Sequence, residues 1–319
     1  MLRNGLIFLS DSRAAKKLVT GTPLRAMSRR FVPGDTVDEL VSAIREANDK
    51  GLFVTANYLG EAEKSKATAA QAADRYTAIL DRISEDGLNA NVSMKFTQLG
   101  QAISDEFLAE HLGRVLDRAE GLDVFIRFDM ESSDYTERTL HAFEDVWSRG
   151  RRNIGVVLQS YLRRSKTDVA RMNELGARVH LCKGAYAEPA AVAFQERSEV
   201  DGNFVALMQI LLKHGHYPAI ATHDDAIVAA TVEYAERESI RPERFEFQML
   251  YGVRRDLQAS LVADGYNVRV YIPFGEAWYP YLMRRLAERP ANMLFMTGSV
   301  VRESPLGFLW PKGDGNKKT

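Results

Sequence analysis

The sequence lacks several features that would assign a protein to a class at once. Among 319 residues it has one cysteine, Cys182, so no disulfide can form within the chain and a reducing compartment is expected. No apolar run approaches the roughly 18 residues that a membrane-spanning helix needs. The apolar run at 6–9 is also too short for a signal-peptide core. We therefore expect a cytoplasmic protein, with a peripheral contact at the inner face of the cell membrane left open.

An excess of charge of one sign is also missing. The chain has 42 Lys and Arg against 43 Asp and Glu, a formal net charge of −1, which argues against nucleic acid as a partner. Its six histidines show no H-x-x-x-H or H-E-x-x-H spacing, and one cysteine cannot build a thiolate site. We therefore expect no metal. A G-x-G-x-x-G motif after the first predicted strand and a Walker motif are both absent, which argues against common nucleotide-binding sheets.

The sequence does contain a regular alternation of strand and helix patterns. The β-rich runs are 51–58, 89–96, 123–130, 153–161, 177–186, 217–224, 244–252 and 267–275. They recur about every 30 residues, the length of a βα unit. The intervals show amphipathic periodicity, as in 105–120, where one stripe is apolar and the opposite face is charged. The pattern predicts an α/β fold, a distorted (β/α)8 TIM barrel, with an open doubly wound sheet as the alternative.

The segments outside these runs predict a division into three parts. Residues 1–50 form an N-terminal helical arm, whose helix at 36–52 begins at the N-cap Thr36 and ends at Gly51. Residues 51–304 form the barrel, with a final helix over the barrel mouth. Residues 305–319, rich in glycine and lysine, form a partly flexible tail.

Polar and aromatic residues gather where the predicted strands end, while the strand bodies are rich in Val, Ile and Phe. In a TIM barrel the carboxyl ends of the strands carry the active site. The residues at these ends are Lys95, Asp129, Gln159, Lys183, Tyr186, Thr222, His223, Gln248 and Tyr271. We expect a functional site there, although loops beginning at strand ends are polar in any barrel.

Two of these residues allow more than one interpretation. Lys95 is an anion ligand, a Schiff-base nucleophile, or a lysine whose ammonium reaches out to water. Asp129 follows Arg127 at strand spacing, so their side chains point the same way. They form an ion pair, or the carboxylate orients groups in the barrel mouth.

Two turns at strand ends could contact a ligand. In "CKGAYAEP" (182–189), Gly184 would let the backbone approach an anion or a ring oxygen closely. In "ATHD" (221–224), Thr222 and His223 offer donors, with a helix-capping turn as the simpler reading.

The stretch "YLMRRLAERPAN" (281–292) follows the last predicted strand. Glu288 lies one helical turn after Arg284 and Arg285, so it can hold one or both guanidinium groups. A solvated ion pair on a helix surface would need no function. The aromatic neighbours and the position after the last strand favour a carboxylate clamp instead, since paired arginines suit a carboxylate.

The ordered motifs resemble those of the monofunctional bacterial proline dehydrogenase family, whose catalytic unit also occurs in bifunctional proline-utilisation enzymes. The motifs are "NYLGE", "VSMKFTQLG", "RFDMESS", "LQSYL", "CKGAYAEP", "ATHD", "FQMLYG", "RVYIPFG" and "YLMRRLAERPAN". The resemblance covers nearly the whole chain. It implies FAD-dependent oxidation of L-proline to Δ1-pyrroline-5-carboxylate, the first step of proline catabolism, with a quinone as electron acceptor. It also implies a pyrroline-5-carboxylate dehydrogenase as a downstream partner.

The resemblance also implies roles for individual residues. Those assigned to proline are Lys95, Leu250, Tyr271, Arg284 and Arg285, with Glu288 holding the arginines and Asp129 ordering the hydrogen bonds around the reaction. Those assigned to FAD are Met130, Gln159, Lys183, Gly184, Ala185, Thr222 and His223. Of all these, Asp129 and Tyr271 are the residues expected to act in catalysis.

One position departs from the family pattern. The family usually has arginine three residues before the lysine of "KGAY", near the flavin N5; this chain has His180 there, with Arg178 two residues earlier. Arg178 would have to reach about 6–7 Å further along the strand. We therefore expect His180 to replace the arginine as a catalytic-site donor.

Two other functions remain compatible with the residues alone. A class I aldolase would use Lys95 or Lys183 as its Schiff-base lysine on the same barrel. A barrel that binds a small carboxylate without catalysis would keep the arginine clamp and need no cofactor.

Overall fold

The β-rich runs of the sequence form parallel strands that close into a barrel in chain order, with β1 paired to β8. The computed structural model describes residues 28–60, 65–279 and 281. The strands are β1 Phe53–Tyr58, β2 Ala90–Met94, β3 Ile126–Phe128, β4 Ile154–Gln159, β5 Arg178–Cys182, β6 Ala219–Ala221, β7 Glu246–Leu250 and β8 Asn267–Phe274. The predicted barrel is confirmed, and the alternative of an open sheet is wrong.

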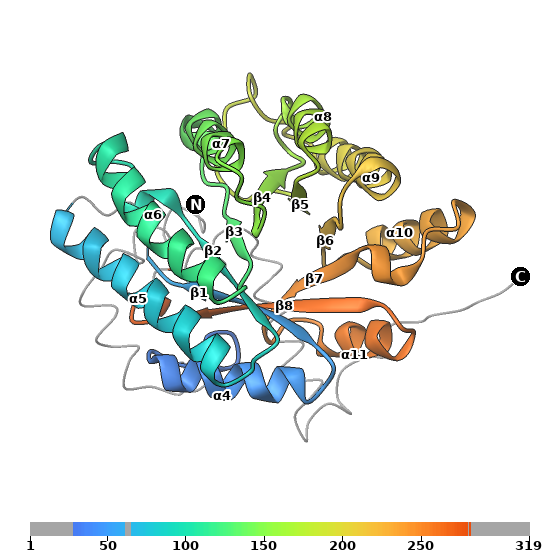
Figure 1. Cartoon of the computed structure of the whole chain (residues 1–319). Coiled ribbons are helices and arrows are strands. Elements are labelled where there is room, and N and C mark those ends of the chain that lie inside the picture. The colour runs from blue at the N-terminus through green and yellow to red at the C-terminus, as the bar shows by residue number, and fades with distance from the viewer. Residues whose placement is uncertain (1–27, 61–64, 280, 282–319) are drawn as a thin grey trace, which may run out of the picture. The chain divides into compact units, whose positions relative to one another are not determined.

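Helices alternate with the strands and lie outside the barrel (Figure 1). They are α4 Val37–Asn48, α5 Lys66–Glu85, α6 Asp105–Gly121, α7 Ser133–Ser148, α8 Ser165–Leu175, α9 Arg197–His214, α10 Asp225–Arg237 and α11 Arg255–Ala263. Two short 3-10 helices, η1 Phe96–Leu99 and η2 Pro242–Arg244, follow β2 and α10. The predicted amphipathic segment 105–120 corresponds to α6.

Helix α4 begins where the sequence predicted. The Thr36 hydroxyl accepts from the Glu39 backbone N–H at 3.3 Å, and the Glu39 carboxylate accepts from the Thr36 N–H at 3.2 Å. This reciprocal capping satisfies two N–H groups that the first helical turn leaves without partners. Past its C-terminus, the chain turns at Gly51, whose φ of 75° suits glycine. The helix packs against β1 and β8, the two strands whose pairing closes the barrel.

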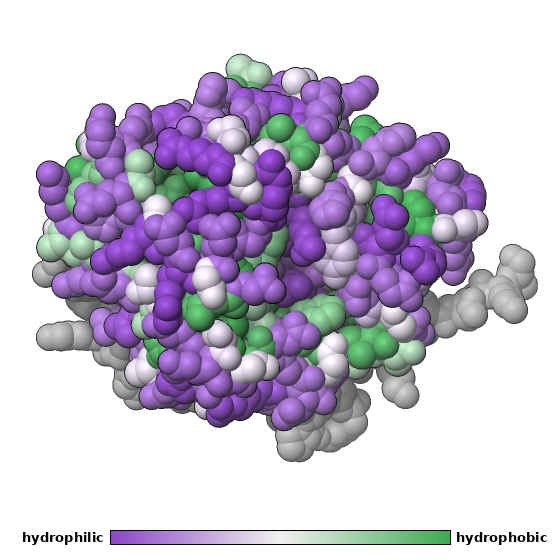
Figure 2. Space-filling model, in the orientation of Figure 1, coloured by the Kyte–Doolittle hydropathy of each residue, from purple (hydrophilic) through white to green (hydrophobic). Residues whose placement is uncertain are grey.

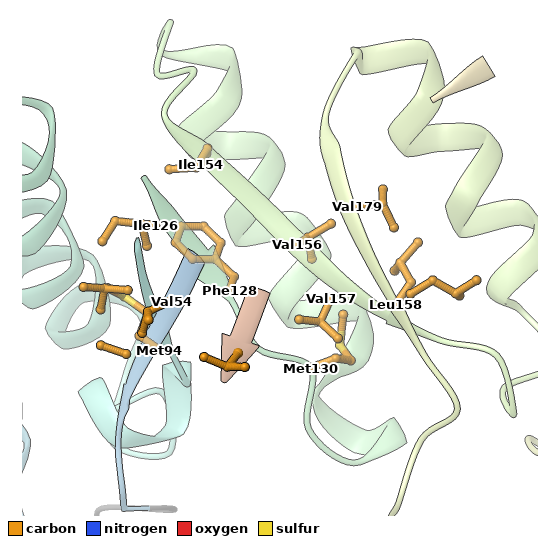
Figure 3. Close-up of a cluster of buried hydrophobic side chains, with 14 of the residues drawn as sticks. Val54, Met94, Ile126, Phe128, Met130, Ile154, Val156, Val157, Leu158 and Val179 are labelled. Atoms are coloured by element: carbon orange, nitrogen blue, oxygen red, sulfur yellow. The ribbon is translucent and has the colours of Figure 1, made fainter. Parts of the chain in front are cut away.

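The hydrophobic core lies between the strands and the helices. Alternate residues of the strands, among them Val54, Ile126 and Val156, are fully buried and belong to one continuous cluster (Figure 3). Phe128 of β3 lies 4.6 Å from Phe96 and 6.0 Å from Phe143 of α7, measured between ring centroids. Burial of this apolar layer, at about 25 cal/mol per Å², is the main stabilising contribution to such a fold.

The inner face of the barrel has the opposite character. Arg127 on β3 lies 3.8 Å from Glu246 on β7, although these strands are not neighbours, so the two side chains meet across the interior. Thr55 donates to Asn91 at 2.6 Å on the same inner face. The expectation that the strand bodies are rich in Val, Ile and Phe, with polar residues gathered at one end, does not hold for this face. Alternation of side chains along each strand turns residues such as Val54 and Ile126 toward the helices and residues such as Thr55 and Arg127 toward the interior.

Residues 29–276 form one compact unit. The other described residues, 28, 277–279 and 281, belong to a second unit. In the second unit, Trp278 and Tyr279 are helical, and the Tyr281 N–H donates to the Ala277 carbonyl at 3.4 Å. A helical turn thus begins soon after β8. The predicted placement of this helix over the barrel mouth lies outside the described residues, and the division at 50/51 and 304/305 remains a prediction.

The surface seen in Figure 2 is mainly hydrophilic, with hydrophobic residues in small separate groups. Within the described part of the chain, Val192 is the exposed large hydrophobic side chain. None of the helices in that part is both long and apolar enough to span a membrane.

Candidate active site

Asp129 lies at the centre of a hydrogen-bond network at the carboxyl ends of the strands. Its carboxylate accepts from the Ser93 hydroxyl of β2, from the Tyr271 hydroxyl of β8 at 2.6 Å, and from the Asn57 amide of β1 at 3.5 Å. The Asp129 N–H donates to the Met94 carbonyl at 2.8 Å, which fixes the backbone as well. The structure therefore brings together two of the predicted catalytic residues, Asp129 and Tyr271.

Burial raises the pKa of Asp129, while hydrogen bonds from Ser93 and Tyr271 and the positive charge of Lys95 act against that rise. Lys95 is half-buried at the N-cap of η1, immediately after β2. Its electrostatic effect on Asp129 places it at the same end of the barrel. The mouth thus combines an ammonium, a buried carboxyl group and a tyrosine hydroxyl.

Arg127 pairs with a partner that the sequence did not suggest. The interpretation of Arg127 and Asp129 as an ion pair is wrong, because Arg127 forms its ion pair with Glu246 of β7 and Asp129 takes hydroxyl donors. Asp129 is consequently available to orient other groups. Strand spacing predicted correctly that both side chains point inward, but it could not identify the strand that faces them.

Glu246 forms the centre of a buried charged cluster below the mouth. It is fully buried, and it accepts from Gln248 at 2.7 Å and from Arg269 Nε at 2.9 and 3.0 Å. Burial by itself would raise the pKa of Glu246, but Arg269 and Arg127 outweigh it and hold the pKa below its ordinary value. Burial lowers the pKa of Arg127 to about 10, with Glu246 opposing the change. The cluster therefore contains two guanidinium ions and one carboxylate at neutral pH.

His180 lies on β5, is 8% exposed, and is electrostatically coupled to the same cluster. Burial and the nearby charge of Arg127 lower the pKa of His180 to about 3. At neutral pH it is an uncharged imidazole, and its Nδ1 has no hydrogen-bond partner. It cannot supply the positive charge that the family arginine would carry, so any role as a donor is that of a neutral group.

The pKa of His180 makes stability sensitive to acid. Between pH 6.5 and about 3 the unfolded chain binds a proton that the folded protein does not, so stability falls as pH falls. His180→Gln should remove about 2–3 kcal/mol of the loss that the wild type shows between pH 7 and pH 4.5. Urea denaturation at both pH values measures this, with His141→Gln on the exposed face of α7 as control. Equal acid losses in wild type and His180→Gln would contradict the neutral buried imidazole.

The predicted flavin-binding residues lie at the ends of β3 to β6. Met130 is buried just after β3, and Gln159 ends β4, where its amide donates to the Glu131 carbonyl at 3.3 Å. The Gln159 Oε1 is buried and has no partner. The Glu131 carboxylate accepts a hydrogen bond from the Thr97 hydroxyl at 2.6 Å. This bond restrains the residue whose carbonyl accepts from Gln159.

The predicted turn at Lys183–Gly184–Ala185 has a backbone conformation that requires glycine. Gly184 has φ of 97°, and a Cβ there would come within 2.2 Å of the Tyr161 ring. Lys183 forms ion pairs with Asp201 of α9 and, at 3.1 Å, with Asp224. The turn is therefore closely packed, and its lysine is held by two carboxylates.

In the "ATHD" segment the capping interpretation is confirmed. The Thr222 hydroxyl accepts from the Asp224 N–H at 3.1 Å, and Asp224 caps α10 by accepting from the Ala226 N–H at 3.2 Å. His223 has a separate contact: its Nε2 accepts from the Leu250 backbone N–H at 2.9 Å. This hydrogen bond assigns the His223 proton to Nδ1. It also joins a predicted flavin contact to Leu250, a predicted proline contact at the end of β7.

Buried polar atoms without hydrogen-bond partners occur on the inner face of the barrel strands. In the described part of the chain they include Gln159 Oε1, His180 Nδ1, Gln248 Oε1, and Nε and Nη1 of Arg127. Such atoms call for a bound group or water, because an unsatisfied buried polar atom costs about 1–3 kcal/mol. A flavin ring carries both carbonyl acceptors and N–H donors, so it is chemically suited to Gln159 Oε1 at the mouth, while the other atoms belong to the buried cluster below the mouth or lie beside it.

A hollow of about 620 Å³ lies elsewhere, between α6 and α7. Leu112, Gly113 and Ala142 line it, and none of the predicted site residues does. On its rim Arg138 is paired with Asp105 at 2.5 Å. Its place between two helices outside the barrel separates it from the candidate site.

The inner-face residues that support the site were not predicted from the sequence; they are Asn57, Ser93, Glu246 and Arg269. A signal was present, because polar residues recur two apart in several strands. Examples are Arg127 with Asp129 and Glu246 with Gln248. Arg284, Arg285 and Glu288 lie outside the described residues.

Comparisons with known proteins agree with this geometry. The family model for proline dehydrogenase matches residues 40–298. Proline dehydrogenase 1 of Bacillus subtilis is 38% identical over 303 residues, which cover 95% of this chain and 100% of that protein. Proline dehydrogenase of Deinococcus radiodurans is 36% identical over 282 residues, covering 86% of this chain and 90% of that protein.

Longer proteins match as well. Bifunctional protein PutA of Escherichia coli is 27% identical over 334 residues, covering 90% of this chain and 25% of that protein. A crystal structure of proline utilization A from Bdellovibrio bacteriovorus, inactivated by N-propargylglycine, has a TM-score of 0.79 and 26% identity. The match covers 92% of this chain and 37% of that one. The family match and these relatives show that this chain belongs to the proline dehydrogenase family of enzymes.

Proposed function

We propose that this protein oxidises L-proline to Δ1-pyrroline-5-carboxylate with bound FAD and passes the electrons to a quinone. Family membership supports proline as the substrate. The observation that carries the proposal is the network of Asp129 with Tyr271, Ser93 and Asn57, which converges from four strands on the barrel mouth. An active site is expected at this end of a TIM barrel.

The substrate carboxylate is bound by cations in this proposal. Lys95 supplies one from the end of β2, and the predicted clamp of Arg284 and Arg285, held by Glu288, supplies the others. Tyr271 and Leu250 provide the wall against the proline ring. The bond from the Tyr271 hydroxyl to Asp129 fixes the orientation of the tyrosine ring, and fixing a substrate in the reactive geometry can supply a large part of the rate.

FAD is held by Met130, Gln159, Thr222, His223 and the turn at 183–185 in this proposal. The flavin would accept a hydride from the carbon next to the proline nitrogen. Gln159 has an unpartnered carbonyl for a ring N–H, and Gly184 allows close approach of the backbone. The neutral His180 contributes no charge at neutral pH, so Arg127 and Arg269 of the buried cluster provide the positive potential below the mouth.

The product and the electrons both need partners. The imine product and its open-chain aldehyde form are substrates for a pyrroline-5-carboxylate dehydrogenase, and the name of the longer relatives describes a bifunctional protein. We propose a separate dehydrogenase as the downstream enzyme and a membrane quinone as the acceptor. This places the protein in the cytoplasm with peripheral contact at the membrane.

Product formation tests the proposal. With FAD, L-proline and a soluble quinone analogue, the purified protein should form a cyclic imine that o-aminobenzaldehyde traps, whereas D-proline serves as the control substrate.

Arg284→Met should raise the KM for proline by about tenfold or more while FAD remains bound, because a bidentate charge-assisted contact is lost. Imine formation without FAD, or an unchanged KM in Arg284→Met, would contradict the assignment.

The aldolase alternative is weakened by the surroundings of Lys183. Its nitrogen forms ion pairs with Asp201 and Asp224, which hold it between two carboxylates rather than free to attack a carbonyl. Borohydride trapping with carbonyl substrates separates the two functions, since a covalent adduct at Lys95 or Lys183 would support the aldolase.

A further inference from the structure

The segment after β7, residues 251–254, is held in part by Arg254, which the sequence did not single out. The Arg254 side chain is 15% exposed. Its Nη1 and Nη2 donate to the two carboxylate oxygens of Asp225, each at 2.9 Å, and its Nε donates to both oxygens of Asp256 at 3.1 Å. The Nη1 also donates to the His223 backbone carbonyl at 3.3 Å. One guanidinium therefore joins the ends of β6 and β7 and the starts of α10 and α11.

The backbone of this segment adopts conformations that its surroundings must enforce. Arg254 has φ of 50° and ψ of 49°, a left-handed conformation that non-glycine residues seldom adopt. Gly252 has φ of 76°, and a Cβ there would lie 2.0 Å from the Arg30 carbonyl oxygen. The Arg30 Nε donates in turn to the Gly252 carbonyl at 3.2 Å. Such conformations persist where contacts on several sides over-determine them.

Leu250, which ends β7 immediately before this segment, is held through both of its backbone groups. Its N–H donates to the His223 ring at 2.9 Å, and its carbonyl accepts from Gln258 at 3.3 Å. Gln258 donates also to the Val253 carbonyl at 2.7 Å. A displacement of the segment would therefore move Leu250, which is the residue proposed to contact the proline ring.

The end of β6 has further restraints that do not involve Arg254. The Thr222 N–H donates to the Gln248 carbonyl at 3.1 Å, and Thr222 and Asp224 complete the cap of α10. Lys183 and Arg197 are additionally paired with Asp224. Loss of Arg254 would consequently release the segment after β7 more than the end of β6.

We propose that Arg254 is a positioning residue that sets the place of Leu250 relative to His223, so that its loss weakens proline binding more than flavin binding. This inference rests on the proposed function, in which Leu250 contacts proline and His223 contacts FAD. Arg254 touches neither ligand and acts through the segment that it holds.

The test compares Arg254→Ala and Arg254→Lys with the wild-type enzyme loaded with FAD. Arg254→Ala should raise the KM for L-proline roughly tenfold, as expected for a displaced binding wall, while the Kd for FAD stays within about threefold. Arg254→Lys should lie between, because a lysine supplies a point charge without the planar fork. Arg171→Ala is the matched control, since Arg171 also bridges two helices through Glu137 and Glu144 but lies outside the site. It should leave the KM unchanged.

A double-mutant cycle distinguishes positioning from general destabilisation. Asp225→Ala should reproduce much of the rise in KM, and the double variant Arg254→Ala/Asp225→Ala should show little further increase. If Arg254→Ala does not fold, Asp225→Ala and Arg254→Lys carry the same comparison, with Tm measured for each.

The outcomes distinguish a wrong positioning role for Arg254 from a wrong proposed function. If wild-type flavin is reduced by L-proline but the variants keep the wild-type KM, or lose FAD affinity as much as proline affinity, the positioning role is wrong. If L-proline does not reduce the wild-type flavin, the proposed function fails first, and the inference about Arg254 fails with it.

Discussion

Replacing Glu246 by alanine is expected to destabilise the folded protein by about 3–5 kcal/mol, because removal of one partner leaves buried charges without compensation. Arg269 would lose the acceptor that holds its Nε at 2.9 Å, and Arg127 would lose the carboxylate 3.8 Å away. Arg127 is 2% exposed and already has two N–H groups without partners, so it cannot turn to water. Urea denaturation at pH 7 measures the change.

A second carboxylate provides the control for Glu246. Glu144 pairs with Arg171 between α7 and α8, with 27% of its side chain exposed, and Glu144→Ala should cost no more than about 1 kcal/mol. Glu246→Gln should fall between the two, since the amide keeps an acceptor for Arg269 and loses the charge. A loss below about 1 kcal/mol in Glu246→Ala would mean that the inner cluster does not hold the barrel together.

Replacing Asp129 by alanine is expected to lower kcat/KM for proline about a hundredfold, the loss that a small misplacement of reacting groups can cause. Tyr271 would lose the acceptor 2.6 Å from its hydroxyl, and Ser93 and Asn57 would lose the carboxylate that they share. Flavin content should stay close to that of the wild type, because Asp129→Ala leaves the neighbouring Met130 in place and the other predicted FAD contacts lie at the ends of β4 to β6. Steady-state kinetics together with the flavin absorbance of each preparation measure both effects.

Tyr271→Phe isolates one bond of the same network. The variant keeps the ring that we propose to pack against proline and removes only the hydroxyl that donates a hydrogen bond to Asp129. Its decrease in kcat/KM should therefore be smaller than that of Asp129→Ala. Asp129→Ala activity within about threefold of the wild type would contradict an ordering role for the carboxylate, since even one misplaced contact should cost more.

The barrel could be predicted from the sequence because its signals are local. Each strand run and each amphipathic helix depends on residues close in the chain, and Thr36 with Glu39 marks the start of α4 by its spacing alone. The polar character of the barrel interior could not be inferred with the same ease. It depends on which of the alternate residues in each strand face inward. The strand sequences are dominated by apolar residues that face the helices, such as Val54 and Ile126, and these mask the polar inner set.

The candidate site was predictable where one strand end carries one functional group, and less so where groups meet across the barrel. Asp129 and Tyr271 were both selected for their strand-end positions, and the structure places them 2.6 Å apart. The pairing of Arg127 with Glu246 depends on the register of strands that are distant in sequence. The neutral state of His180 likewise follows from burial and from charges on neighbouring strands, which no local pattern contains.

An anaerobic titration of the FAD-loaded protein with L-proline shows whether proline reduces the bound flavin. We expect the visible absorbance of the oxidised flavin to be bleached by about one equivalent of L-proline, since one hydride reduces one flavin. A quinone analogue should then restore the colour. Protein that takes up no FAD, or whose bound flavin stays oxidised in excess L-proline, would contradict the proposed function.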